Sequence, residues 1–391
     1  MPSSSLWRFD PNHYLSSLKG LRDQYRMRKR RRFYFSIKNV EPRPKSSMPE
    51  SDKSEVRRQL IQHLREFRRT CFCRDIVLRL YLQTTEENPA HAQNIAKNLL
   101  DLFSFDPKRR KSDRRGLYKD DNQISALSVT CHHGDSQARI WGYAYPMECL
   151  FQDIHLLMSS TDKHDDFRQF RDQYEFSDHL EALEGWRRDE ANIRRSYGDQ
   201  AFESFLAHLN YLAQEALLSR NSLSIHDLNA MYNVTGRYFG FDHSKLWEQI
   251  FHYSPLRMLL DEFPQQSGTS SVWKRHIDQK LRDFQANFGG MVNPLVVPVA
   301  LEVLIKPPPP SRNRGNPDLD NLLRKYIIPR VNEILNPVVK NGITRFEAYR
   351  LSPAQEGTNG FVNVAIVADT PGYDSVFKEI DEGLERWEDS L

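Results

Sequence analysis

The sequence predicts an α/β (α+β) fold made of two similar units joined by a helical segment. Residues 75–82 and 299–305 each alternate side chains as a half-buried strand does. Each of these stretches is followed by a helical pattern and then by a pair of strand-like runs. A polar stretch with amphipathic helical periodicity, residues 161–250, separates the two series. We therefore expect two small α/β units in tandem.

The first unit begins after a polar arm with a short helix in residues 1–25. Its first helix has Val56, Leu60 and Leu64 on one face and arginines on the other, which is typical of a helix packed on a sheet. The expected order is strand 33–37, helix 54–67, strand 75–82, helix 92–103, and strands 124–131 and 138–145.

The second unit repeats this order near the C-terminus. We expect strand 256–263, helix 272–284, strand 299–305, a helix from residue 318 to 335, strands 344–351 and 361–368, and an amphipathic acidic helix in residues 374–391. The matching order predicts a tandem repeat that forms an intramolecular pseudo-dimer, with domains at 1–160, 161–250 and 251–391. Residues 161–250 are expected to be a packed helical insertion.

The charge is unevenly distributed along the chain. The net charge is +3, but residues 1–160 contain 29 Lys and Arg against 18 Asp and Glu, whereas the remainder contains 26 against 34. Clustered cations on one part of a chain favour contact with nucleic-acid phosphates. The alternatives are a solvated face, or pairing with the acidic part of the same chain. The predicted DNA-binding residues are Arg28, Lys29, Arg30, Arg31, Arg32, Lys108, Arg109, Arg110, Lys111, Arg114, Arg115, Arg312 and Arg314.

Three features of the sequence bear on the compartment. No run of eighteen apolar residues exists, so we expect no membrane span. The start of the chain lacks the basic and apolar regions of a signal peptide. All four cysteines lie in the first 150 residues, which argues against a disulfide framework across the chain. We expect a cytoplasmic protein.

The segment Pro317 to Leu335 carries the strongest chemical signal. Asp318 and Asp320 stand at the start of the predicted helix, followed at once by Asn321. Two carboxylates one residue apart provide the oxygen ligands that Mg²⁺ prefers, and such an ion assists displacement at a phosphodiester. The alternative is a helix cap, because an Asp before an apolar helix stabilises its free N–H groups.

The order strand, proline-rich loop, D-x-D-N helix, strand, strand resembles the RusA family of Holliday-junction resolvases. The resemblance implies a dimeric Mg²⁺-dependent DNA endonuclease with the pattern D-x-D-N-x-x-K, in which two acids bind the metal and the lysine is catalytic. Asp318 and Asp320 match the acids, and Arg324 occupies the lysine position. In the first unit Lys97 keeps the lysine position, and Asp121, with Asp120 beside it, matches the third catalytic acid.

Neither unit holds the complete set, because the D-x-D positions of the first unit read His91-Ala92-Gln93. Three alternatives follow. The second unit works alone, with Glu347 as third acid and with Arg324 and Lys325 offsetting phosphate charge. The acids of opposite units meet in one composite site. Otherwise the fold persists as a DNA-binding pseudo-nuclease.

The sequence therefore predicts a protein that binds structured or branched DNA, with Mg²⁺-dependent cleavage in its C-terminal unit. The rival prediction is a catalytically inactive DNA-binding or scaffold subunit of a larger assembly. In that case the basic N-terminal third holds phosphates, while the helical insertion and the acidic C-terminal half meet protein partners.

Overall fold

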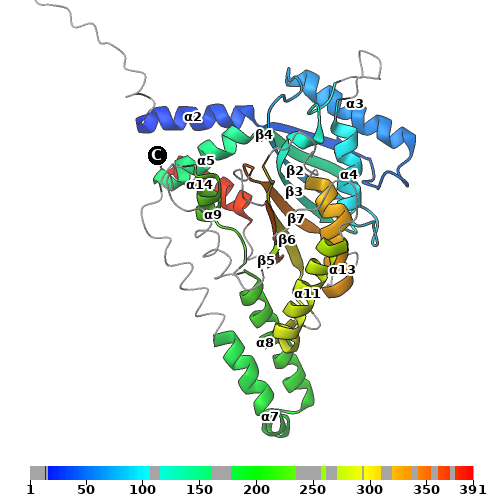
Figure 1. The fold of residues 1–391 in the computed structure, drawn as a ribbon, viewed down its shortest axis with the longest axis vertical. Helices are drawn as coiled ribbons and strands as arrows, with labels where there is room; N and C mark the ends of the chain where they lie inside the picture. The colour runs from blue at the N-terminus through cyan, green and yellow to red at the C-terminus, as the bar shows by residue number, and fades with distance from the viewer. Residues whose placement is uncertain are drawn as a thin grey trace, which may run out of the picture.

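One eight-stranded sheet runs through the whole molecule (Figure 1). The computed structural model describes residues 14, 16–105, 115–160, 178–219, 221–234, 257–260, 271–292, 295–309, 319–335, 342–353, 360–369 and 375–390. The strand order across the sheet is β1-β4-β2-β3-β7-β6-β8-β5. The mixed α/β class predicted from the sequence is confirmed.

The N-terminal half of the sheet has β2 at its centre. β2 pairs in parallel with β3 and antiparallel with β4, and β4 pairs antiparallel with the edge strand β1. Nearly every residue of β2 is buried, as expected for a strand covered on both faces. The bounds are β1 Phe33–Lys38, β2 Ile76–Gln83, β3 Ile124–His132 and β4 Arg139–Pro146.

The C-terminal half repeats the same pairing around β6. β6 pairs in parallel with β7 and antiparallel with β8, which pairs antiparallel with the edge strand β5. The bounds are β5 Arg257–Leu260, β6 Val299–Lys306, β7 Arg345–Arg350 and β8 Phe361–Ala368. The predicted strands are therefore confirmed to within a few residues, apart from the shorter β5.

The two halves meet where β3 and β7 pair antiparallel, with Ser128 opposite Glu347. The sheet thus has the same order and the same sense of pairing when it is followed from either edge. This symmetry fits the predicted tandem pseudo-dimer, while common ancestry of the halves stays a prediction. The junction of β3 and β7 is the only direct strand pairing between the halves among the described residues.

One face of the sheet is covered by the helices that connect its strands (Figure 1). Their apolar stripes share one core with the sheet, in which Leu60, Leu99, Leu281 and Leu322 are buried. α8 of the helical insertion packs against β8 and α11 on the same side. The bounds are α3 Glu50–Glu66, α4 Ala92–Phe103, α8 Asp199–Ser219, α11 Ser271–Val292, α12 Leu319–Leu322, the π-helical turn η2 Leu323–Ile327, and α13 Ile328–Leu335.

The other face is covered by helices that follow the strands or lie near the termini. Tyr25, Leu150, Leu228 and Phe377 bring α2, α5, α9 and α14 into a second core. The predicted C-terminal amphipathic helix is α14, and it packs on α5 and α9 of its own chain. The bounds are α2 Leu18–Arg31, α5 Met147–Ser160, α9 Ile225–Tyr232 and α14 Val376–Asp389.

Three local features differ from the sequence prediction. α5 was not predicted, and the short N-terminal helix extends to Arg31, so it includes the basic run. The helix after β6 also contains a π-helical turn, in which the Ile328 N–H donates to the Leu323 carbonyl. Pro329 follows directly and has no N–H to donate, so a wider turn at this point avoids part of the helix disruption that proline causes.

The helical insertion projects away from the sheet. α7, Glu190–Tyr197, lies against α8 at the lower end of the molecule (Figure 1). Trp186, which precedes α7 in the chain, stacks on Phe202 of α8. Within the described residues, no helix has both the length and the apolar character needed to cross a membrane.

Candidate functional site

The Lys97 ammonium lies among three carboxylates where the two halves of the molecule meet. Its Nζ atom is 2.7 Å from Asp320 Oδ2, 3.0 Å from Asp121 Oδ2 and 3.1 Å from Asp101 Oδ1. Lys97, Asp101 and Asp121 come from the N-terminal half and Asp320 from the C-terminal half. We call these four residues the junction cluster.

α4 positions the cation of the junction cluster. Its buried side carries Ile95, Leu99 and Leu102, which anchors the helix on the sheet. Lys97 and Asp101 are four residues apart and therefore lie on the same helix surface. The packing of α4 thus fixes where the ammonium can reach.

Asp121 is held by a short capped turn directly before β3. The 3₁₀ turn η1 spans Asp121–Gln123, and Asp120 is its N-cap. The Asp120 carboxylate accepts the Asn122 N–H, while the Gln123 side chain accepts the Asp120 N–H in return. The Asp120 carboxylate therefore caps the backbone of η1, and the carboxylate of its neighbour Asp121 contacts Lys97.

Asp320 enters the junction cluster from the first turn of α12. Leu319 and Leu322 on either side of it are buried in the shared core, and α12 packs against α4. Only 7% of the Asp320 side chain is exposed. Its Oδ2 atom lies within ion-pair distance of Lys97 but is not aligned for a hydrogen bond with any described group. A buried carboxylate with such an orphaned oxygen depends strongly on the nearby ammonium.

The charges in the junction cluster influence one another. Burial lowers the pKa of Lys97, but the nearby negative charges of Asp320 and Asp121 outweigh that effect, so the pKa is raised and Lys97 stays an ammonium. Burial raises the pKa of Asp121, with a further contribution from the charge of Asp320, while Lys97 opposes the rise. Asp121 is therefore a stronger base than an aspartate with an ordinary pKa.

The chain matches no protein-family model, no curated protein and no solved structure. The resemblance to junction resolvases therefore depends on the motif residues and their arrangement. In that arrangement each half contributes residues of the resolvase pattern that are missing from the other half. The first half gives Lys97 and Asp121, and the second half gives Asp320. Of the three alternatives that the sequence leaves open, this geometry matches the composite site.

Asp318, the other acid of the D-x-D pair, lies outside the described residues, as do Arg312 and Arg314. Arg324 and Lys325 lie in the π-helical turn η2, where Arg324 is half-buried and Lys325 is exposed. The cation that contacts Asp320 is Lys97 of the opposite half.

The prediction that Glu347 supplies the third acid is wrong. Glu347 is buried on β7, where Tyr349 donates a 2.8 Å hydrogen bond to it and Ser128 a longer one. Tyr349 stacks on Phe377 of α14, which covers the second face of the sheet. Side chains two residues apart on a strand share a face, so Glu347 and the junction cluster lie on opposite faces of the sheet.

The donor chemistry of the junction cluster suits Mg²⁺, but its described residues do not form a metal site. No group of three His, Cys, Asp or Glu side chains in the described part of the chain is arranged to hold a metal ion. The Lys97 ammonium already lies between the carboxylates of Asp121 and Asp320.

Two of the predicted phosphate-binding arginines are committed to internal ion pairs. Arg28 is 6% exposed, and its Nε atom lies 2.6 Å from Asp153 Oδ1 of α5. Arg32 lies 3.1 Å from Asp153 and 2.7 Å from Asp381 of α14. The prediction that these two side chains contact DNA is wrong, because they pair with acidic residues of their own chain.

The rest of the basic run is more accessible. Arg26 and Lys29 both pair with Glu388 at the end of α14, and Arg31 lies 3.8 Å from Glu148. Arg30 and Arg31 are exposed. In the second predicted cluster Arg115 is exposed, whereas Lys108, Arg109, Arg110, Lys111 and Arg114 lie outside the described residues.

Sequence reasoning missed one member of the junction cluster. Asp101 follows Lys97 by four residues on α4, and this spacing is the signal that could have found it.

Proposed function

We propose that this protein binds structured or branched DNA and cleaves a phosphodiester bond at the junction cluster. The observation that supports the proposal is the 2.7 Å approach of Lys97 Nζ to Asp320 Oδ2, with Asp121 at 3.0 Å. Each half of the chain lacks residues of the resolvase pattern, and the residues that remain come together in one place. The resemblance of the motifs supplies the reaction class.

The chemistry assigned to each residue follows from its surroundings. An ammonium held near a scissile phosphate offsets the charge that builds up during displacement, and this is the role of Lys97. Asp121, with its raised pKa, accepts a proton from an attacking water more readily than an ordinary aspartate does. Asp320 positions Lys97. A requirement for Mg²⁺, with Asp318 and Asp320 as ligands, stays a prediction of the motif.

The symmetry of the sheet supports branched DNA as the substrate. Two halves with the same strand pairing meet at the β3 and β7 junction. Such halves suit a substrate whose arms are themselves related by symmetry, much as protein dimers suit paired half-sites. A reducing compartment such as the cytoplasm is part of the proposal, and the four unpaired cysteines agree with it.

A second candidate function is a DNA-binding or scaffold subunit without catalysis. The observation that favours it is that Lys97 is already paired with three carboxylates. The projecting α7 and α8 pair would then present a surface to a protein partner, with Tyr197 and Phe205 exposed on it.

The test is cleavage of labelled four-way junctions in Mg²⁺, in Mn²⁺ and in EDTA. Asp121→Asn and Asp320→Asn are compared with wild type, and Asp120→Asn and Glu347→Gln are the matched controls. Loss of a positioned base or charge slows such reactions about 100-fold or more, so the first two variants should bind the junction and fail to cut it. Both controls should cut.

Two outcomes would redirect the proposal. If wild type binds junctions and cuts none under any of the three conditions, the scaffold function replaces cleavage. If Glu347→Gln abolishes cutting while Asp121→Asn does not, the active residues lie in the C-terminal half alone.

A further inference from the structure

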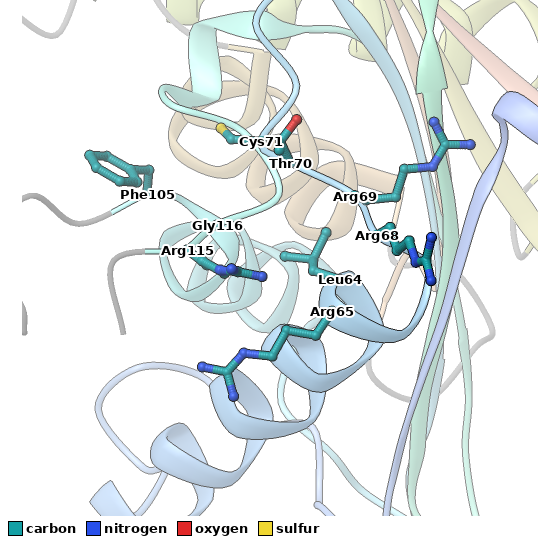
Figure 2. A pocket seen from close by; sticks show the side chains of 9 residues that line it. All are labelled: Leu64, Arg65, Arg68, Arg69, Thr70, Cys71, Phe105, Arg115 and Gly116. Atoms are coloured by element: carbon teal, nitrogen blue, oxygen red, sulfur yellow. The ribbon is translucent and has the colours of Figure 1, made fainter. Parts of the chain in front are cut away.

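A pocket lined by arginines opens at the C-terminal end of α3 (Figure 2). Its volume is about 680 Å³, within the usual range of ligand sites. We call it the arginine pocket. The described residues that line it are Leu64, Arg65, Arg68, Arg69, Thr70, Cys71, Phe105, Arg115 and Gly116, and none of them is acidic.

One wall of the pocket is the end of α3, which finishes in a Schellman turn. The Arg69 N–H donates to the Leu64 carbonyl at 2.7 Å, and the Arg68 N–H donates to the Arg65 carbonyl. This turn places Arg68 at φ +51°, a left-handed conformation in which glycine is the usual residue. An arginine that retains a strained backbone beside a pocket indicates that its side chain has a function there.

The opposite wall is formed by two segments that touch each other closely. A Cβ atom on Gly116 would lie 2.4 Å from the Phe105 backbone nitrogen, so only glycine allows this approach. The contact is reinforced by the Phe105 N–H, which donates to the Tyr118 carbonyl, and by the Leu117 N–H, which donates to the Phe103 carbonyl. Phe105 and Arg115 are thereby fixed at the edge of the pocket.

The pocket presents positive charge next to an exposed aromatic ring. Arg65, Arg68 and Arg115 are exposed, and in the described part of the chain no carboxylate forms an ion pair with Arg68 or Arg115. Arg69 donates to the Arg30 carbonyl and so has a structural role as well. Phe105 is 36% exposed. One guanidinium group can donate two parallel hydrogen bonds to the oxygens of a phosphate, and an exposed aromatic ring can stack on a nucleobase.

The pocket is linked to the junction cluster by a short buried segment. Leu117 and Tyr118 are fully buried, and η1 with Asp121 follows them. Asp121 is six positions after Arg115, and an extended chain of that length spans at most about 20 Å. A DNA duplex rises about 3.4 Å along its axis for each phosphate of one strand, so about six base pairs cover at most this distance.

We propose that the arginine pocket binds one nucleotide of a DNA strand that leads to the junction cluster. The phosphate lies on Arg65, Arg68 and Arg115, and the base lies against Phe105. This inference rests on the proposed function, since it names where the substrate strand is held. The same chemistry, a phosphate joined to a planar base, also occurs in a free mononucleotide, and the experiment separates the two sources.

The experiment measures binding of a labelled four-way junction with single-stranded tails, by anisotropy at several salt concentrations. Arg68→Gly, Arg115→Ala and Phe105→Ala are compared with wild type. Arg58→Ala is the matched control, because Arg58 is an exposed arginine of α3, the helix that ends at the pocket, and it does not line the pocket. Each pocket variant should lose about tenfold in affinity. Each arginine variant should also reduce the slope of log affinity against log salt by about 0.7.

Arg68→Gly also distinguishes a loss of DNA binding from a loss of folding. Glycine relieves the left-handed backbone at this position, so this variant should melt at or above the temperature of wild type. Weaker DNA binding by a protein of equal or greater stability is therefore the expected result. Deoxyadenosine monophosphate, titrated calorimetrically into wild type, is the second arm of the experiment.

The outcomes keep the two proposals apart. If the pocket variants bind junctions as tightly as wild type with the same salt slope, the pocket assignment fails while junction binding and cleavage stand. If wild type binds no DNA but binds the mononucleotide, and Arg115→Ala does not, the pocket takes free nucleotides and the proposed function fails. If wild type binds neither probe, both proposals are overturned.

Discussion

Lys97 of the N-terminal half lies 2.7 Å from Asp320 of the C-terminal half, and this contact joins the two halves on the face of the sheet covered by α4 and α12. Asp320 is almost fully buried, and Lys97 is the cation that keeps its charge from being isolated. The contact therefore has two consequences, one for stability and one for chemistry. The first can be measured without knowing the substrate.

Lys97→Met should destabilise the protein by about 3 kcal/mol, because it leaves the buried carboxylate of Asp320 without its cation. The double variant Lys97→Met/Asp320→Leu should recover part of that loss, since the most buried carboxylate is then absent while Asp101 and Asp121 still lack their cation. Urea unfolding of the two variants and wild type measures the difference. A single variant as stable as wild type would mean that the ion pair contributes nothing.

Asp121→Asn should be at least as stable as wild type at pH 7. Burial raises the folded-state pKa of Asp121, so the folded protein holds this proton more tightly than the unfolded chain does. The resulting stability is fully present below the unfolded pKa of about 3.9 and is lost as the pH rises through the raised folded pKa. The advantage of the amide should therefore disappear below about pH 4. Thermal melts of both proteins between pH 3 and 8 test this sign.

Asp381→Asn should behave in the opposite way. Burial alone would raise the pKa of Asp381, but Arg79 and Arg32 overcome this and lower it. Its stabilisation is therefore present above the unfolded pKa of about 3.9 and is lost as the pH falls through the lowered folded pKa. The variant should lose about 2 kcal/mol at pH 7 and approach wild type in acid. The same melts measure it, and a constant difference across the pH range would contradict the expectation.

Much of this fold can be predicted from the sequence, because alternation along a strand and helical periodicity are local properties. β2, β6 and α4 are found where those patterns predict them. α5 was missed although Met147, Leu150, Ile154 and Leu157 recur at helical spacing. The chemistry is harder to predict, because it depends on which face a strand side chain takes. Glu347 is near Asp320 in sequence but is directed to the opposite face.

The junction cluster and the arginine pocket show the same limit. Nothing in the sequence states that α4 and α12 pack together, so the approach of Lys97 to Asp320 could only be left open as an alternative. Likewise, no local sequence pattern predicts that Arg68 adopts a left-handed backbone conformation. Clustered cations predict a phosphate surface in the same way whether they are exposed, as Arg30 is, or buried, as Arg28 is.

The proposed cleavage at a single junction cluster predicts a particular product. A monomer with one composite site should nick one strand of a four-way junction in each encounter, whereas a symmetric dimer with two sites would make paired cuts. Junctions labelled on each strand in turn, analysed on denaturing and native gels, distinguish nicked junctions from resolved duplexes. Paired symmetric cuts at low protein concentration would contradict a single site.

Arg28 and Arg30 provide a test of how the basic helix α2 is used. Arg28 is buried against Asp153, so Arg28→Met should cost about 2 kcal/mol of stability, with Arg32 still offsetting part of the charge on Asp153. It should leave the salt dependence of DNA binding unchanged. Arg30 is exposed, so Arg30→Ala should leave stability unchanged and reduce the salt slope for duplex DNA by about 0.9. Urea unfolding and anisotropy at several salt concentrations measure both quantities.

If the salt slope falls equally in both variants, Arg28 must leave its internal ion pair to reach phosphate. If it falls in neither, α2 does not contact DNA, and its charge serves only to hold α5 and α14 in place.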